Sequence, residues 1–175
     1  MRTLVLGGIR SGKSRWAEEI MAGDSSVRYV ATGAGADADP SWAQRVAEHR
    51  SRRPGSWNTA ETADVACLLR DDAHTATLVD DLGGWLTAAL DRRGWDCGSV
   101  ASDVDELVRA VEGFAAPLVL VSPEVGLTVV SATASGRRFT DELGTLNQRL
   151  ARCCEQVVLV VAGLPVWVKP TKAFT

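Results

Sequence analysis

The sequence predicts an α/β protein with a mostly parallel sheet, helices on both faces and one antiparallel strand near the C-terminal end. Short apolar segments typical of buried strands alternate along the chain with longer segments of helical periodicity. The strand expected at 157–161 reaches Ala162 and Gly163 and turns into an apolar partner at 164–168, which indicates a hairpin. A single domain, residues 1–175, is expected because a chain of this length builds one core rather than two.

One segment fits the phosphate-binding loop pattern G-x-x-x-x-G-K-[ST] at every fixed position: Gly7-Gly8-Ile9-Arg10-Ser11-Gly12-Lys13-Ser14. It follows a short apolar strand at 3–6 and opens a helix at 14–21, which is the order that this loop requires. Its glycines allow successive N–H groups to surround a phosphate chain. Lys13 adds positive charge, Ser14 supplies a hydroxyl for Mg²⁺, and the helix dipole points at the same phosphates. The sequence therefore predicts a nucleoside triphosphate site on a P-loop, RecA-like domain.

The remaining elements follow from the same periodicities. Further strands are expected at 27–30, 57–61, 76–81 and 117–121, and further helices at 42–53, 63–69, 83–90, 100–114 and 136–154. The first helix is expected to bury Ala17, Ile20 and Met21. The longest helix is expected to bury a leucine-rich face and to leave Asn147 available on another. Trp57 is interpreted as a core anchor rather than a platform for a stacked base.

Two strand ends offer further candidates, because ligands in open α/β sheets collect beyond the carboxyl ends of the strands. The strand at 27–30 runs into Ala31-Thr32-Gly33, whose small side chains admit a ligand. The strand at 76–81 closes with two acids, and a carboxylate there can hold Mg²⁺ or its water. Side chains alternate across a strand, so Asp80 and Asp81 cannot both face the phosphates. Asp81 also suits the N-cap of the next helix.

One cluster of positive charge lies in the helix expected at 42–53, where Arg45, Arg50, Arg52 and Arg53 surround His49. Such a run is usually a solvated helix face, and the residues alone favour that interpretation. A net charge of −3 gives the chain no general attraction to nucleic acid or to an anionic membrane. A bound polyanion must therefore be held by a local basic patch, and no nucleic-acid partner is expected.

The longest apolar runs are much shorter than the ~20 residues that a membrane span needs, and the N-terminal residues do not have the pattern of a signal peptide. The expected location is therefore the cytoplasm, with no membrane span.

Several segments together resemble a known family, and they are distributed over essentially the whole chain. They are the loop 7–14, Tyr29-Val30-Ala31-Thr32, Arg45-Val46-Ala47-Glu48-His49-Arg50, Trp57 with Thr59 and Glu61, Glu124-Val125-Gly126, Arg137-Arg138-Phe139 and the segment 160–165. The pattern resembles the bifunctional adenosylcobinamide kinase/adenosylcobinamide-phosphate guanylyltransferase of cobalamin biosynthesis. The loop alone would select only a superfamily, whereas the His49 and Glu124 segments are much more specific.

The resemblance implies two reactions at one site. ATP or GTP phosphorylates the aminopropanol hydroxyl of adenosylcobinamide, and GTP then donates GMP to that phosphate with release of pyrophosphate. The second reaction passes through a guanylylated histidine, and the matching residue is His49. An imidazole with an unperturbed pKa of ~6.5 is largely neutral near pH 7, can attack an α-phosphorus, and departs readily once protonated.

The resemblance also assigns the other site residues, with Lys13 and His49 as the catalytic pair and Ser14 and Asp80 as the Mg²⁺ ligands. Nucleotide contacts fall on the loop 7–14 and on Ala31, Thr32, Gly33, Arg50, Ser51, Arg52, Arg53, Glu61 and Asp80. The family forms homotrimers, so an oligomer that binds a corrinoid substrate is expected. Pro123, Thr128 and Ser131 depart from the family pattern beside the corrinoid site.

Two other interpretations use the same loop. A different small-molecule kinase would need the loop and Asp80 but would have no use for a nucleophilic His49. A non-catalytic RecA-like subunit would bind a nucleotide and hydrolyse it slowly without any acceptor. Its residues 45–53 would contact a partner. Guanylyl transfer separates the family interpretation from both.

Overall fold

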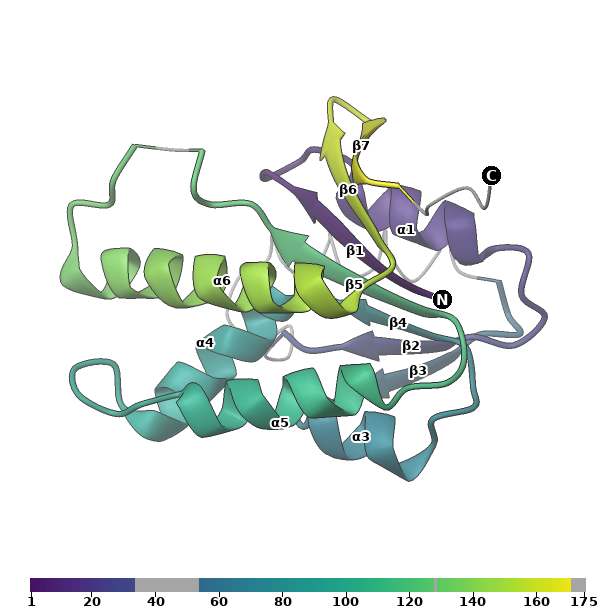
Figure 1. Cartoon of the computed structure of the whole chain (residues 1–175), viewed down its shortest axis with the longest axis horizontal. Coiled ribbons are helices and arrows are strands. Elements are labelled where there is room, and N and C mark those ends of the chain that lie inside the picture. The colour runs from purple at the N-terminus through teal and green to yellow at the C-terminus, as the bar shows by residue number, and fades with distance from the viewer. Residues whose placement is uncertain (34–53, 128, 171–175) are drawn as a thin grey trace.

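The computed structural model describes residues 1–33, 54–127 and 129–170. In this part of the chain, seven strands form one sheet in the order β3-β2-β4-β5-β1-β6-β7 (Figure 1). The strands are β1 (Arg2–Gly7), β2 (Arg28–Ala31), β3 (Asn58–Glu61), β4 (Thr77–Asp80), β5 (Leu118–Pro123), β6 (Gln156–Val161) and β7 (Leu164–Lys169). The first six are parallel and β7 runs antiparallel to β6, as the sequence predicted.

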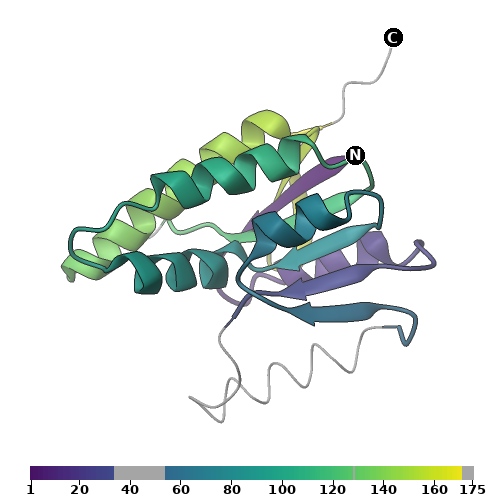
Figure 2. The same ribbon diagram turned by 90° about the horizontal axis from the view of Figure 1, so that it is seen from below.

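Helices cover both faces of this sheet (Figures 1 and 2). They are α1 (Lys13–Met21), α3 (Val65–Asp71), α4 (Leu82–Arg93), α5 (Ala101–Glu112) and α6 (Ala134–Cys153). Strand β1 shows how the chain builds the two apolar layers, because successive side chains point to opposite faces. Leu4 packs in the larger core with α3 to α6, and Val5 packs in the smaller core with Ala17 and Met21 of α1. The predicted fold class is confirmed.

The strands and helices expected within the described residues are present, with ends shifted by a few positions. The helix expected at 42–53 lies outside those residues. Trp57 is 8% exposed and stacks on Tyr29 with ring centroids 6.5 Å apart, so it is a core residue as predicted. None of the described helices combines the length and the apolar character that crossing a membrane would take.

Two expectations about helix faces were wrong. Ile20 is 41% exposed, because α1 is a short helix that meets the sheet along the narrow stripe of Ala17 and Met21, four positions apart. Asn147 is 6% exposed rather than available. Its amide donates to the Pro123 carbonyl oxygen at 3.1 Å and its Oδ1 accepts from the Ser122 hydroxyl at 2.6 Å. A polar side chain is needed there because α6 buries these groups at the end of β5.

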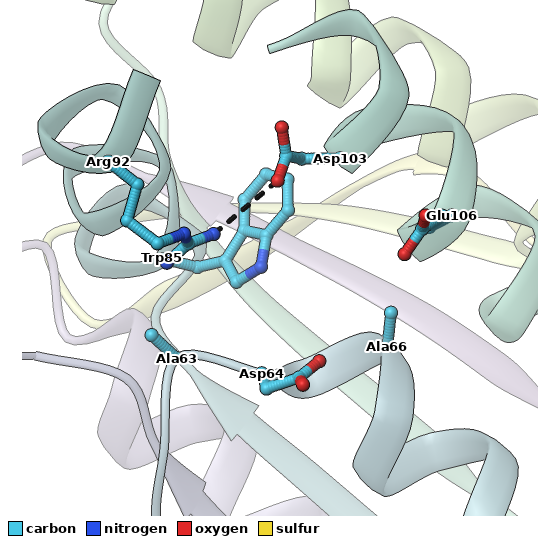
Figure 3. Close-up of a pocket in the computed structure, with 7 residues that line it drawn as sticks. All are labelled: Ala63, Asp64, Ala66, Trp85, Arg92, Asp103 and Glu106. Atoms are coloured by element: carbon cyan, nitrogen blue, oxygen red, sulfur yellow. Dashed lines mark hydrogen bonds and ion pairs between the residues drawn. The ribbon is translucent and has the colours of Figure 1, made fainter. Parts of the chain in front are cut away.

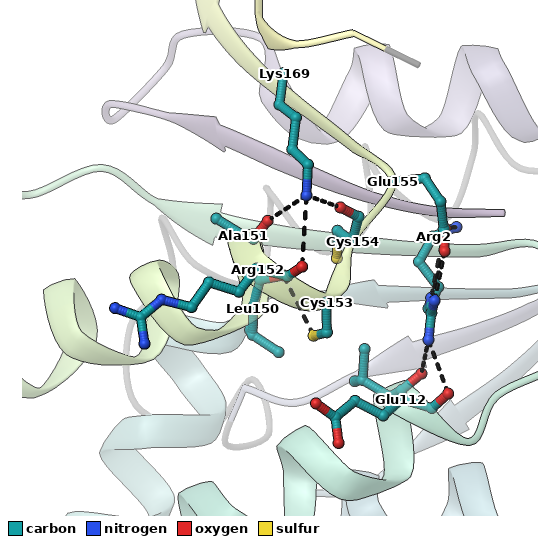
Figure 4. Close-up of polar contacts among 10 residues, drawn as sticks. Arg2, Glu112, Leu150, Ala151, Arg152, Cys153, Cys154, Glu155 and Lys169 are labelled. Atoms are coloured by element: carbon teal, nitrogen blue, oxygen red, sulfur yellow. Dashed lines mark hydrogen bonds and ion pairs between the residues drawn. The ribbon is translucent and has the colours of Figure 1, made fainter. Parts of the chain in front are cut away.

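Charged side chains tie the strands to the helices at the amino ends of β1 and β6 (Figure 4). Arg2 pairs with Glu155 and donates to the carbonyl oxygen of Glu112 at 2.8 Å. Lys169 Nζ donates to the carbonyl oxygens of Ala151 at 2.9 Å and Cys154 at 2.5 Å, where the end of α6 leaves carbonyl groups without helical partners. These contacts fix the sheet at one end, and the candidate site occupies the opposite end.

Candidate nucleotide site

The phosphate-binding loop connects the end of β1 to the start of α1. Its backbone takes left-handed angles at Arg10, with φ of 58°, and at Gly12, with φ of 91°. The Ser11 N–H donates to the Gly8 carbonyl oxygen at 3.2 Å and closes a turn within the loop. This alternation of conformations is the backbone geometry that directs consecutive N–H groups toward an anion.

Helix α1 presents its amino end to this loop. Gly12 is its N-cap and has no side chain that could cap the helix, and the first turn contains no acidic residue. The positive end of the helix dipole is therefore not compensated by a carboxylate of α1 itself. Lys13 Nζ donates to the Gly8 carbonyl oxygen at 3.4 Å, so its ammonium group lies over the same loop.

Asp80 meets the loop through the first turn of α1. Its Oδ1 accepts a hydrogen bond from the Ser14 hydroxyl at 3.1 Å, and its Oδ2 accepts one from the Tyr29 hydroxyl at 2.6 Å. A hydroxyl and a carboxylate in contact are oxygen ligands of the kind that Mg²⁺ prefers, so these side chains fit the ion expected there. The structure thus brings together the two residues that the sequence analysis assigned to the metal.

Asp81 caps α4, the role that the sequence analysis considered for it. Its Oδ1 accepts a hydrogen bond from the Gly84 N–H at 2.9 Å. Burial, followed by the negative charge of Asp80, raises the pKa of the Asp81 carboxyl above its usual value. Adjacent acids at the end of β4 therefore have separate roles, one at the loop and one at the helix start.

The ends of β2 and β3 lie beside Asp80. Residue Ala31 is paired with Asp80 on one side and with Glu61 on the other, so all three stand at one edge of the sheet. The side chain of Thr32 is 3% exposed, and its hydroxyl donates to the Asp81 carbonyl oxygen. Thr32 therefore orients the end of β4, while Gly33 and Glu61 are exposed beside it.

Other candidates from the sequence analysis lie outside the described residues. They are His49, Arg50, Ser51, Arg52 and Arg53.

Two contacts at the site escaped the sequence analysis. Tyr29 precedes the end of β2 by two positions, and alternation along β2 and β4 could have placed it on the same face as Asp80. The Gly163 N–H donates to the Ser11 carbonyl oxygen at 2.7 Å, a contact between segments 152 positions apart that local patterns do not reveal.

A separate cavity of about 320 Å³ lies among α3, α4 and α5 (Figure 3). Asp64, Asp103 and Glu106 contribute carboxylates to its wall, and Arg92 of the wall is paired with Asp103 at 3.5 Å. Negative side chains repel phosphate groups, so this cavity does not suit the triphosphate of a nucleotide. The phosphate-binding loop is therefore the better candidate for the triphosphate site.

Two solved structures share this fold. One is an ATPase from the type III secretion system of pathogenic bacteria, with a TM-score of 0.55 and 12% identity, and the match covers 90% of this chain and 51% of that one. The other is the ATPase EscN of enteropathogenic E. coli, with a TM-score of 0.53 and 12% identity over 92% of this chain and 43% of that one. At this identity the likeness shows the fold alone.

Curated relatives match along nearly their full length. The bifunctional adenosylcobalamin biosynthesis protein CobP of Pseudomonas aeruginosa is 40% identical over 173 residues, which cover 97% of this chain and 98% of the relative. The bifunctional adenosylcobalamin biosynthesis protein CobU of Salmonella typhimurium is 37% identical over 183 residues, covering 97% of this chain and 100% of the relative.

A family model points to the same family as these relatives. The model, described as cobinamide kinase / cobinamide phosphate guanyltransferase, matches residues 3–168. The chain therefore belongs to the cobinamide kinase / cobinamide phosphate guanyltransferase family.

Proposed function

We propose that the phosphate-binding loop serves both activities of the family at one nucleotide site. In the first, ATP or GTP phosphorylates the aminopropanol hydroxyl of adenosylcobinamide. In the second, GTP donates GMP to that phosphate and yields adenosylcobinamide-GDP and pyrophosphate. The observation that carries the proposal is the contact of Asp80 with Ser14 beside a complete phosphate-binding loop, in a chain that belongs to this family.

The kinase step is mainly a matter of position and charge. Backbone N–H groups of the loop and the Lys13 ammonium hold the phosphates of the donor and stabilise the charge that spreads over the transferred group. Ser14 and Asp80 would hold Mg²⁺, which neutralises phosphate charge when bound. Ala31, Thr32, Gly33 and Glu61 border the same edge, where they would contact the rest of the nucleotide.

The guanylyl step needs a nucleophile, and His49 is the residue proposed for it. A neutral imidazole nitrogen attacks the α-phosphorus of GTP, a phosphorus–nitrogen bond forms, and the bond to pyrophosphate breaks. A phosphate oxygen of adenosylcobinamide phosphate then attacks the same phosphorus and displaces the imidazole. Arg50, Ser51, Arg52 and Arg53 would contact the phosphates during this step. Support for these five residues comes from the sequence motif and from family membership.

GTP labelled at the α-phosphate tests the proposal without corrinoid. The label should stay on the protein through alkaline denaturation, be lost in acid, and map to the peptide that contains His49. His49→Asn should block labelling and GMP transfer while leaving appreciable kinase activity, because phosphoryl transfer to a hydroxyl does not need this nucleophile. His74→Asn is the matched control, since His74 is the other histidine of the chain and lies in a turn after α3.

The label decides between this function and a simple kinase on the same fold. An unlabelled wild type, or GMP transfer by His49→Asn, would remove the guanylyltransferase assignment and favour the simple kinase. Labelling that persists in His49→Asn but is lost in His74→Asn would show that His74 is the nucleophile and would contradict the assignment of His49.

We also propose that the protein is a homotrimer, as the family is. Strand β7 supports an oligomer, because all six of its residues are exposed and four of them are large and apolar. These are Leu164, Val166, Trp167 and Val168, with exposed fractions of 69%, 53%, 48% and 61%. An apolar edge strand of this kind is typical of an interface. Light scattering should give three times the chain mass, and a fully active monomer would contradict the proposal.

A further inference from the structure

Tyr29 is the only tyrosine of the chain and lies beneath the candidate metal site. It is 2% exposed, in the smaller core between the sheet and α1. Ala31 is paired with Asp80 across β2 and β4, and alternation places Tyr29 on the same face of the sheet as Asp80. The Tyr29 hydroxyl donates to Asp80 Oδ2 at 2.6 Å, a short hydrogen bond to a charged acceptor.

The two oxygens of Asp80 have different partners. Oδ2 accepts from Tyr29, whereas Oδ1 faces the Ser14 hydroxyl at 3.1 Å on the side of the phosphate-binding loop. The terminal torsion of an aspartate is soft, so a carboxylate without a fixed partner samples a broad range of orientations. Mg²⁺ requires near-ideal octahedral geometry, which makes the orientation of this carboxylate important for binding.

The ring of Tyr29 is itself held in place. It stacks on the buried ring of Trp57, with centroids 6.5 Å apart and an angle of 30° between the planes. The stacking of the two rings fixes the direction in which the phenolic hydroxyl points, and the hydroxyl itself takes no part in that stacking. A phenylalanine at position 29 would keep this packing and remove only the hydrogen-bond donor.

We propose that Tyr29 is a positioning residue for the metal, which locks one oxygen of Asp80 and thereby aims the other at the Mg²⁺ that accompanies the nucleotide. The proposal rests on the assignment of Asp80 to Mg²⁺ in the proposed function. Tyr29 acts through Asp80 and does not touch the nucleotide. A purely structural tyrosine would contribute to stability alone, so the dependence of nucleotide binding on Mg²⁺ separates the two roles.

Calorimetric titration of GDP into the full chain tests this directly, once with Mg²⁺ and once with EDTA. Tyr29→Phe should bind GDP in Mg²⁺ about tenfold more weakly than wild type, equivalent to about 1.4 kcal/mol. Its affinity in EDTA should stay within about twofold. The Mg²⁺ concentration that gives half-maximal kinase activity should rise by a similar factor.

Ser122→Ala is the matched control, because it also removes a buried hydroxyl that donates a hydrogen bond of 2.6 Å, to Asn147. It should lower the melting temperature and leave the Mg²⁺ dependence unchanged. An equal loss of affinity in Mg²⁺ and EDTA in Tyr29→Phe would overturn the proposal, because it would mean a general structural defect.

Asp80→Asn separates failure of this inference from failure of the proposed function. If it abolishes the benefit of Mg²⁺ and Tyr29→Phe does not reduce it, Tyr29 has no positioning role and the assignment of Asp80 stands. If Asp80→Asn has no effect, the metal assignment falls and the inference falls with it.

If Tyr29→Phe does not fold, a second measurement tests the proposal. Fluorotyrosine incorporated into the otherwise unchanged protein gives a single ¹⁹F resonance, since the chain has one tyrosine. The resonance should shift when Mg²⁺ is added to the GDP complex. An unchanged resonance would overturn the proposal.

Discussion

The Gly163 N–H donates a 2.7 Å hydrogen bond to the Ser11 carbonyl oxygen, and this bond joins the β6–β7 hairpin to the phosphate-binding loop. Both residues of the turn have left-handed backbone angles, with φ of 51° at Ala162 and 81° at Gly163, as tight hairpins require. Trp167 of β7 also meets Trp16 of α1 edge to face, with centroids 6.0 Å apart. The only antiparallel pair of the described sheet thus supports the loop from the side.

Gly163→Val should loosen this support. The space around Gly163 is open, but a β-branched residue is strained at a φ of 81°, by roughly 1–2 kcal/mol. Relaxation of the turn would move the N–H away from Ser11, so GTP should bind several-fold more weakly in calorimetric titration. Gly163→Asn is the control, because asparagine tolerates the left-handed conformation and should stay close to wild type. Equal affinities for the Val variant and wild type would show that the hairpin does not support the loop.

Gly7→Ala should impair the loop by a different mechanism, since its backbone angle is not the constraint. A Cβ at position 7 would lie 2.4 Å from Ser11 Oγ and 2.9 Å from the Val160 carbonyl oxygen, and the second of these atoms belongs to the backbone of β6. The loop must therefore shift, and we expect at least a tenfold loss of GTP affinity, or about 1.4 kcal/mol.

Gly8→Ala provides the comparison on the neighbouring residue. A Cβ there would meet no atom within 4 Å, and the N–H is retained. Its GTP affinity should stay within about twofold of wild type. If the two variants bind GTP equally well, the close packing of Gly7 is not what fixes the loop.

Glu155→Gln should reduce stability in a manner that depends on pH. The hydrogen bond from Arg2 holds the pKa of the Glu155 carboxyl at about 2, well below its ordinary value. A lowered pKa in the folded state contributes stability above the unfolded pKa, and this contribution is lost as the pH falls toward 2. Because the Glu155 side chain is 40% exposed, solvent screening limits the loss at pH 7 to about 1 kcal/mol.

Urea unfolding of the wild type and Glu155→Gln across pH 2 to 7 measures this contribution. The difference in unfolding free energy should be full at neutral pH and should shrink between pH 4.5 and 2. Glu19→Gln is a suitable control, because the Arg15–Glu19 pair is largely exposed. A constant difference at all pH values would show that the charge of Glu155 is not responsible.

The sequence predicted the fold because its strands and helices carry clear local patterns. Periodicity located the described elements. The loop motif and the acids at the end of β4 identified Ser14 and Asp80 as candidates, and the structure places these two side chains in contact. Local patterns did not indicate that Asn147 is buried, because its burial depends on hydrogen bonds with Ser122 and Pro123 at the end of β5, more than twenty positions away. The Gly163 contact was missed for the same reason, since it forms between distant parts of the chain.

Lys13→Ala should abolish both the kinase and the guanylyl reactions, because one triphosphate site is proposed to serve both. The lost ammonium group lies over the loop, as its contact with the Gly8 carbonyl oxygen shows, and it would face the phosphates in either reaction. Product formation from adenosylcobinamide, ATP and GTP can be followed by mass spectrometry, and the protein label from α-labelled GTP reports the first half of the guanylyl reaction separately. Arg15→Ala is the control, since this residue lies on the same helix, pairs with Glu19 in solvent, and should leave both reactions intact. Guanylyl transfer retained in Lys13→Ala would require a second nucleotide site and would end the one-site proposal, whereas loss of both reactions with normal folding would support it.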